Sequence, residues 1–172
     1  LCVRLPRRQL AAPLLVHEQT WLAVLAARLP LAIPAPVRLG SPGRGYPWRW
    51  SVVPWLAGET ADLEALHPAE AKTFAAFLAS LHTPAPAAAP VNPVRGVPLQ
   101  HRAAAVAERM QRLRAQTAAI TQEIEATWAD ALAAPVAMDA RWIHGDLHAR
   151  NVLVQHGRLS GIIDWGDLTA GD

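Results

Sequence analysis

Three oxygen-bearing side chains near the C-terminal end of the chain, Asp146, Asn151 and Asp164, flank two short apolar runs. These runs, residues 151–154 and 159–163, are separated by a glycine-containing segment, a pattern typical of a β-hairpin. Asp146 and Asn151 lie on the loop entering the hairpin and Asp164 follows its second strand, so we expect the three side chains to converge. Such oxygen ligands suit Mg²⁺, which takes one or two carboxylates and completes its shell with water and phosphate.

The motifs around these residues occur as a pair at a fixed separation. His144-Gly145-Asp146 with Asn151, followed by Ile162-Ile163-Asp164-Trp165 and Gly171-Asp172, resembles the aminoglycoside phosphotransferase branch of the protein-kinase-like fold. The resemblance implies an α+β fold in two lobes, incomplete at both ends of this chain, and transfer of the ATP γ-phosphoryl group to a hydroxyl of a small molecule. That acceptor would be an aminoglycoside-like antibiotic or a metabolite. Asp146 would be the catalytic base, and Asn151 and Asp164 would hold Mg²⁺.

Other interpretations of the same residues remain open. His144 and His148 with Asp146 could form a zinc site, but a His-x₃-His pair needs a helix, and strand patterns and Gly145 disfavour one here. Asp146 and Asn151 could simply cap turns, which leaves their coincidence with Asp164 unexplained. The chain could also be a non-catalytic, nucleotide-binding remnant, because no glycine-rich loop precedes Leu1. Retention of the three oxygen ligands argues against that.

The first elements carry a second candidate pair. Residues 1–5 form a strand candidate, and residues 12–28 have helical periodicity with Glu18 inside the apolar stripe. A carboxylate that points inward is costly unless it is paired, and Arg4 on the preceding strand is its natural partner. By resemblance this pair orients the α- and β-phosphates of the nucleotide, with arginine where the family usually has lysine.

The remaining pattern completes the expected two-lobe arrangement. Strands are expected at 37–40 and 48–53, and helices at 68–82, 100–114 and 120–133. Residues 1–53 would form the N-terminal lobe, 54–59 a hinge, and 60–172 a mostly helical lobe with the catalytic hairpin at 142–166. Residues 55–59 resemble the hinge of that family, and by this resemblance the main chain of Trp55 and Leu56 would bond the adenine edge. The helix over 68–82 is expected to bury Ala71, Phe74, Leu78 and Leu81, and the core is expected to take Tyr46, Trp48, Trp50 and Trp55.

Composition narrows the class of protein. The 172 residues are 52% hydrophobic and 17% charged, which describes a globular chain and not a disordered one. The net charge of +2 gives no basis for nucleic-acid binding, and no uninterrupted apolar run is long enough for a membrane. A lone cysteine, Cys2, fits a cytoplasmic protein, and no protein partner is evident. Since the chain opens on Leu1 and ends at Asp172 just after the second motif, we expect an internal fragment.

Overall fold

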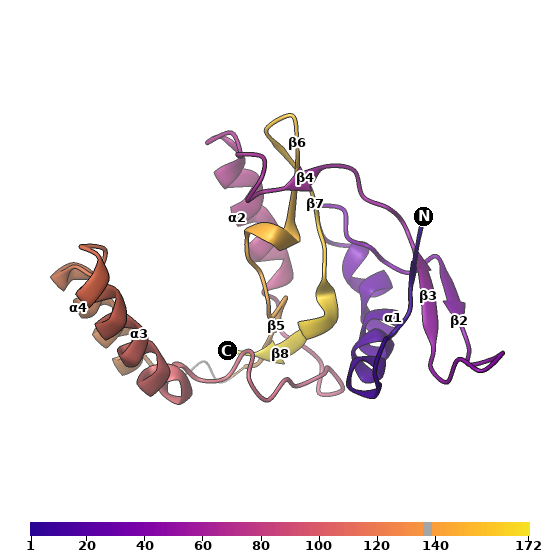
Figure 1. Cartoon of the computed structure of the whole chain (residues 1–172), viewed down its shortest axis with the longest axis horizontal. Helices are drawn as coiled ribbons and strands as arrows, with labels where there is room; N and C mark the ends of the chain where they lie inside the picture. The colour runs from indigo at the N-terminus through magenta and orange to yellow at the C-terminus, as the bar shows by residue number, and fades with distance from the viewer. Residues whose placement is uncertain (136–138) are drawn as a thin grey trace.

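The computed structural model describes residues 1–135 and 139–172. Its N-terminal part is a three-stranded antiparallel sheet with the order β1-β3-β2, built from β1 (Cys2–Arg4), β2 (Arg38–Gly40) and β3 (Trp50–Val53). The 3-10 turn η1 (Gln9–Ala11) leads into helix α1 (Ala12–Ala26), which packs beside this sheet (Figure 1). The Gln19 side chain donates to the Trp50 carbonyl at 2.9 Å and to the Ser51 hydroxyl at 3.0 Å, which fixes α1 relative to the strands.

The C-terminal part contains helix α2 (Glu70–Leu81) and two small sheets. Strands β4 (Glu59–Thr60), β6 (Val152–Gln155) and β7 (Arg158–Ile162) form one, in the order β4-β6-β7. Strands β5 (Arg141–Ile143) and β8 (Thr169–Gly171) form the other. The 3-10 turns η3 (Ala149–Asn151) and η4 (Trp165–Asp167) lie at the ends of the β6–β7 hairpin. The segment leaving β3 is therefore joined to the hairpin through β4.

One apolar core connects the two parts. Leu22 and Leu25 from α1 belong to the same buried cluster as Phe77 from α2 and Ile162 and Trp165 from the hairpin. Trp165 is fully buried, and its indole nitrogen donates to the Ile162 carbonyl at 3.0 Å. Because this core includes the residue next to Asp164, packing of the two parts also determines where the end of the hairpin lies.

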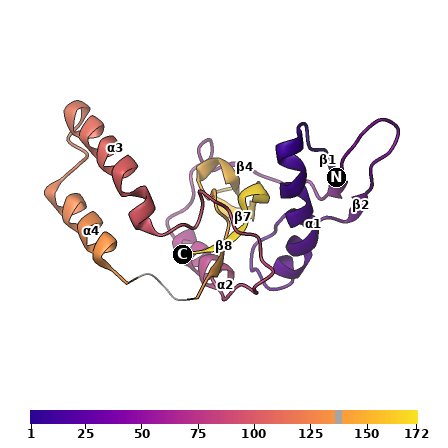
Figure 2. The same cartoon turned by 90° about the horizontal axis from the view of Figure 1, so that it is seen from below.

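Two further helices form an antiparallel pair that projects from the rest of the molecule (Figures 1 and 2). They are α3 (Ala103–Gln116) and α4 (Gln122–Ala133), and the 3-10 turn η2 (Leu99–Arg102) precedes α3. Neither helix contains a buried residue in the part of the chain that the structure describes. Across the described ranges, no helix has both the length and the apolar character that a membrane crossing requires.

The mixed α+β class, the four expected helices and the hairpin are present, with ends shifted by a few residues. Two details of the expected core are wrong. Ala71 is exposed and Phe77 is the fully buried aromatic residue of α2, because the helix presents a face rotated from the expected one. The four aromatic residues expected in the core are not buried, and Trp55 is 75% exposed because it lies in the segment between the two parts.

Candidate active site

His144 anchors the loop that carries Asp146 through two hydrogen bonds of its ring. The amide of Asp146 donates to Nδ1 of His144 at 3.3 Å, so Nε2 carries the ring proton and donates to the Ile163 carbonyl at 2.9 Å. His144 is buried, and burial lowers its pKa, although the carbonyl of Ile163 and the carboxylates of Asp164, Asp146 and Asp167 act in the opposite sense. A neutral His144 therefore ties this loop to the end of β7.

Gly145 permits a close backbone contact at the same place. Its φ is +84°, and a Cβ atom added there would clash with the carbonyl oxygen of Asp167. Only glycine avoids both the steric clash and the left-handed backbone penalty. The peptide before Asp146 can consequently lie directly on η4.

Asn151 and Asp164 lie on neighbouring ends of β6 and β7. The side-chain nitrogen of Asn151 donates to the Asp146 main-chain carbonyl at 2.9 Å. The main-chain carbonyl of Asn151 accepts from the Ile163 amide at 2.9 Å. Asp164 is exposed in the left-handed region with φ 59° and ψ 66°, an uncommon conformation for a residue other than glycine. Among the residues that the structure describes, the Asn151 side-chain oxygen and the Asp164 carboxylate make no hydrogen bond, so both could bind a ligand. One amide oxygen and one carboxylate fit Mg²⁺, which takes its other ligands from water and phosphate.

The Asp146 carboxylate is bound by a residue that the sequence analysis did not identify. Nη2 of Arg95 lies 2.7 Å from Oδ1 of Asp146, and Nε of Arg95 lies 3.2 Å from Oδ2 of Asp167. The other Asp146 oxygen, Oδ2, lies 3.5 Å from Nε2 of His148. One oxygen of the carboxylate is therefore fixed by a cation, while the other faces His148 at longer range.

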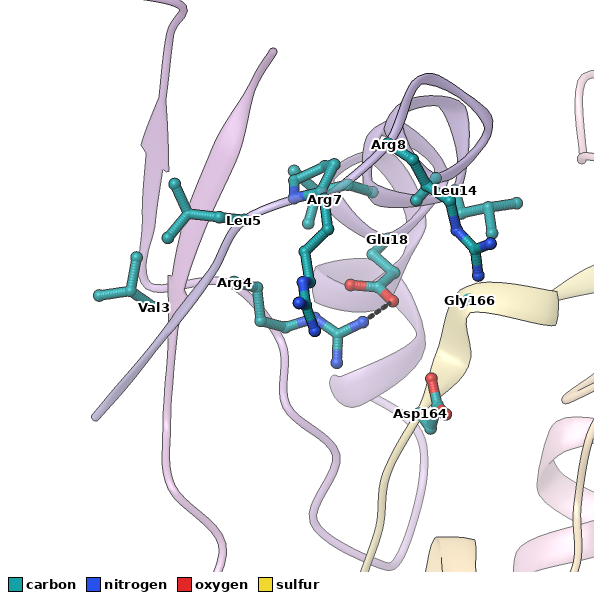
Figure 3. Close-up of a pocket in the computed structure, with 12 residues that line it drawn as sticks. Val3, Arg4, Leu5, Arg7, Arg8, Leu14, Glu18, Asp164 and Gly166 are labelled. Atoms are coloured by element: carbon teal, nitrogen blue, oxygen red, sulfur yellow. Dashed lines mark hydrogen bonds and ion pairs between the residues drawn. The ribbon is translucent and has the colours of Figure 1, made fainter. Parts of the chain in front are cut away.

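The expected contact between Arg4 and Glu18 is present across from Asp164. The guanidinium of Arg4 lies 2.6 Å from the Glu18 carboxylate, which is 2% exposed (Figure 3). Desolvation raises the pKa of Glu18 to about 7, more than Arg4 lowers it, and the charge of Asp164 raises it further. Arg4, Glu18, Asp164 and Gly166 line a cavity of about 450 Å³.

Two more cations reach this cavity. The side chains of Arg7 and Arg8, which follow β1, both line it: Arg7 lies beside Arg4, and Arg8 extends toward Gly166 (Figure 3). Their position directly after the strand that carries Arg4 was the available signal in the sequence. Three guanidinium groups around one cavity favour a ligand with several negative charges, such as a nucleotide phosphate chain.

A second cavity, of about 300 Å³, adjoins the first at Arg4. Trp55 and Leu56 line it together with Cys2, Val53, Leu153 and Ile163. Within the described residues, the main-chain groups of Trp55 and Leu56 make no hydrogen bond. An apolar slot beside open main-chain groups can accept a flat heterocycle that bonds through its edge.

A zinc site at His144, Asp146 and His148 is not supported by this geometry. Both ring nitrogens of His144 are hydrogen-bonded to the main chain, at Ile163 and Asp146. Within the described parts of the chain, no group of three or more His, Cys, Asp and Glu side chains is placed to hold a metal ion. Zinc would need His144 to turn out of the core.

Comparison with known proteins supplies independent information about this arrangement. All of residues 1–172 match the model of the phosphotransferase enzyme family. The GDP and kanamycin complex of APH(2")-IIia is 25% identical to this chain, with a TM-score of 0.61, and the match covers 99% of this chain and 62% of that one. No curated protein sequence matches the chain significantly.

Two further solved structures share the fold at lower identity. The streptomycin–ATP–APH(2")-IIa ternary complex is 20% identical, with a TM-score of 0.59 and coverage of 99% of this chain and 60% of that one. The apoenzyme of macrolide 2'-phosphotransferase MphH from Brachybacterium faecium is 23% identical, with a TM-score of 0.57 and coverage of 99% and 59%. The protein-kinase-like α+β fold is thereby confirmed. The chain spans about three fifths of the length of these structures.

Proposed function

Because this chain belongs to the phosphotransferase enzyme family, we propose that its protein transfers the γ-phosphoryl group of ATP to a hydroxyl of a small molecule. The acceptor would be an aminoglycoside-like antibiotic or a metabolite with comparable hydroxyl groups, since structural relatives were solved with kanamycin and with streptomycin and ATP. We place the protein in the cytoplasm, where its nucleotide and its reduced Cys2 would be maintained.

The observation that carries this proposal is the position of Asp146, Asn151 and Asp164 around the end of one hairpin, opposite the Arg4–Glu18 pair. His144 and Asn151 both bind the main chain of the loop that carries Asp146, so the candidate base and the candidate metal ligands are parts of one rigid unit. Arg4 lines both cavities, one lined by apolar side chains and one by cations. A nucleotide whose base occupies the apolar cavity and whose phosphates occupy the cationic cavity would extend toward Asp164.

In the proposed reaction, the acceptor hydroxyl oxygen attacks the γ-phosphorus and the bond from that phosphorus to the β,γ-bridging oxygen breaks. Asp146 orients the hydroxyl and receives its proton, leaving a phosphate monoester and ADP. Arg4 binds the α- and β-phosphates, and Glu18 keeps its guanidinium in place. The main chain of Trp55 and Leu56 bonds the adenine edge. Asn151 and Asp164 would hold Mg²⁺, which neutralises charge on the phosphates when it is bound.

The test is a coupled ADP-release assay on the full gene product with Mg²⁺–ATP and a panel of hydroxylated acceptors. The panel contains aminoglycosides, macrolides, sugars and amino alcohols, and each is also tested without protein. We expect at least one acceptor to stimulate ADP release and to gain a phosphate monoester detectable by mass spectrometry. Binding of Mg²⁺–ATP without phosphorylation of any acceptor would favour a nucleotide-binding protein that is not an enzyme.

A further inference from the structure

The loop that carries Arg95 is fastened along strand β8. The Ala170 amide donates to the Pro90 carbonyl at 2.7 Å, the Asn92 amide to the Thr169 hydroxyl at 2.8 Å, and the Asp172 amide to the Gly96 carbonyl at 2.9 Å. These contacts begin before Arg95 and end after it. Arg95 therefore projects from an anchored segment.

Asn92 and Asp167 anchor the main chain and the side chain of Arg95. The side-chain oxygen of Asn92 accepts from the Arg95 amide at 3.2 Å, and the side-chain nitrogen of Asn92 donates to Oδ1 of Asp167 at 3.0 Å. The second Asp167 oxygen accepts from Nε of Arg95 at 3.2 Å. Asp167 thus fixes the plane of the guanidinium, and in this orientation Nη2 lies 2.7 Å from Oδ1 of Asp146.

We propose that Arg95 is the positioning residue for Asp146 in the reaction proposed above, on which this inference rests. By binding Oδ1 alone, it stops rotation of the carboxylate and presents Oδ2 to the acceptor hydroxyl. A charge-assisted hydrogen bond of this length is strong and directional. Because Asp167 shares the guanidinium, Arg95 holds Asp146 through one oxygen and leaves the other available.

The first test is kinetic and uses the full gene product with its best acceptor. Arg95→Met keeps an unbranched apolar stem and removes the guanidinium donors, and we expect kcat to fall by up to about 100-fold, the scale of a small misplacement of a reacting group. The KM for ATP should stay within roughly twofold, because Arg95 acts through the base and not through the nucleotide. Arg95→Lys should recover part of kcat, since an ammonium can still donate to Oδ1.

Arg102→Met is the matched control. Arg102 donates to the Val94 carbonyl of the same loop at 2.8 Å, so this variant loosens the loop without removing the cation from Asp146. We expect it to keep kcat within roughly twofold of the unaltered protein. Equal losses in Arg95→Met and Arg102→Met would overturn the inference, and so would an unchanged or increased kcat in Arg95→Met.

A crystallographic comparison tests the same inference without any activity. In the Arg95→Met protein we expect the Asp146 carboxylate to turn from its position or to take several orientations, while Arg102→Met leaves it as it is. An unmoved, singly oriented Asp146 in Arg95→Met would overturn the inference. If the unaltered protein phosphorylates no acceptor, the proposed function fails, and this comparison still decides whether Arg95 positions Asp146.

Discussion

Glu18 is a buried carboxylate whose proton affinity is set by two opposing effects. Desolvation raises its pKa from 4.5 to about 7, even though the Arg4 guanidinium lies 2.6 Å away. Because the folded-state pKa lies above the unfolded value, the folded protein retains this proton over a range in which the unfolded chain has released it. The contribution of Glu18 to stability is therefore present at low pH and is lost as the pH rises from 4.5 to about 7.

This shift predicts how Glu18→Gln behaves. Glutamine has nearly the same shape and no charge, so the variant should lack the pH-dependent loss. Between about pH 4 and pH 8, its free energy of unfolding should rise relative to that of the unaltered protein by at most about 3 kcal/mol. Urea unfolding at both pH values measures this difference. A difference that is the same at both would show that Glu18 titrates normally in the folded protein.

The site residues that could be predicted from the sequence are those whose role follows from their place in the periodic pattern of a helix or strand. Glu18 interrupts an apolar stripe, and a strand that ends just before the helix limits its partner to few cations, so Arg4 followed from the sequence. Arg95 lies 51 residues from Asp146 and 72 from Asp167, in a loop without periodicity. Its contacts exist only because β8 pairs with β5 and carries this loop to the site, which no local pattern encodes.

Among the elements, the hairpin and its approach contain two glycines with positive φ and different surroundings. Gly157 lies in the two-residue turn, at φ +73°, and the nearest atoms to an added Cβ are 3.9 Å away. Gly145 has a similar φ, but its added Cβ would clash with the Asp167 carbonyl. A substitution at Gly157 therefore tests backbone strain alone, whereas one at Gly145 adds displacement of the loop that carries Asp146.

We accordingly predict different outcomes for alanine at these glycines. Gly157→Ala should lose about 1–2 kcal/mol of stability, the penalty for a left-handed alanine, and retain its kcat. Gly145→Ala should lose about as much or more and also lose kcat by about 100-fold, because the loop must move away from η4. Thermal unfolding and acceptor-dependent ADP release measure both effects. Comparable kcat values for the two variants would contradict the importance of the contact between Gly145 and Asp167.

Sequence patterns predicted the elements that show hydrophobic periodicity or contain a recognisable turn. The four helices and the β6–β7 hairpin are of this kind, and His156-Gly157 adopts positive φ at both positions, as a tight hairpin turn requires. Strands β4 and β8 have two and three residues. Strands so short are defined by their partners, here β6 and β5, and their existence depends on the assembled fold.

At the scale of the whole molecule, the α3–α4 pair is the part with the least burial. Leu113 and Ile124 are 43% and 44% exposed, and grooves on the pair are lined by Trp128 together with Met110 on α3 and Ile124 on α4. The solved relatives extend well beyond the part that matches this chain, because the match covers only about three fifths of their length. Apolar surface of this kind promotes association when nothing covers it.

Residues 1–172 expressed alone should therefore be inactive and prone to associate. Positioning supplies nearly all catalysis in phosphoryl transfer, so we expect no acceptor-dependent ADP release from this piece and only weak binding of Mg²⁺–ATP. Light scattering should rise with protein concentration, and replacing Ile124 by glutamate should reduce it. Robust turnover by residues 1–172 would show that a complete site is contained within them.

The central claim is that Asp146 acts as the base and that Asp164 binds Mg²⁺. Measuring Mg²⁺–ATP affinity and turnover together in two variants tests it most directly. In the full gene product, Asp146→Asn should lower turnover by at least about 100-fold and leave nucleotide affinity nearly unchanged, because in the proposed reaction Asp146 contacts the acceptor and not the nucleotide. Asp164→Ala should lose the Mg²⁺-dependent part of nucleotide binding itself. An Asp146→Asn protein that keeps most of its turnover, or an Asp164→Ala protein that binds Mg²⁺–ATP normally, would contradict the account.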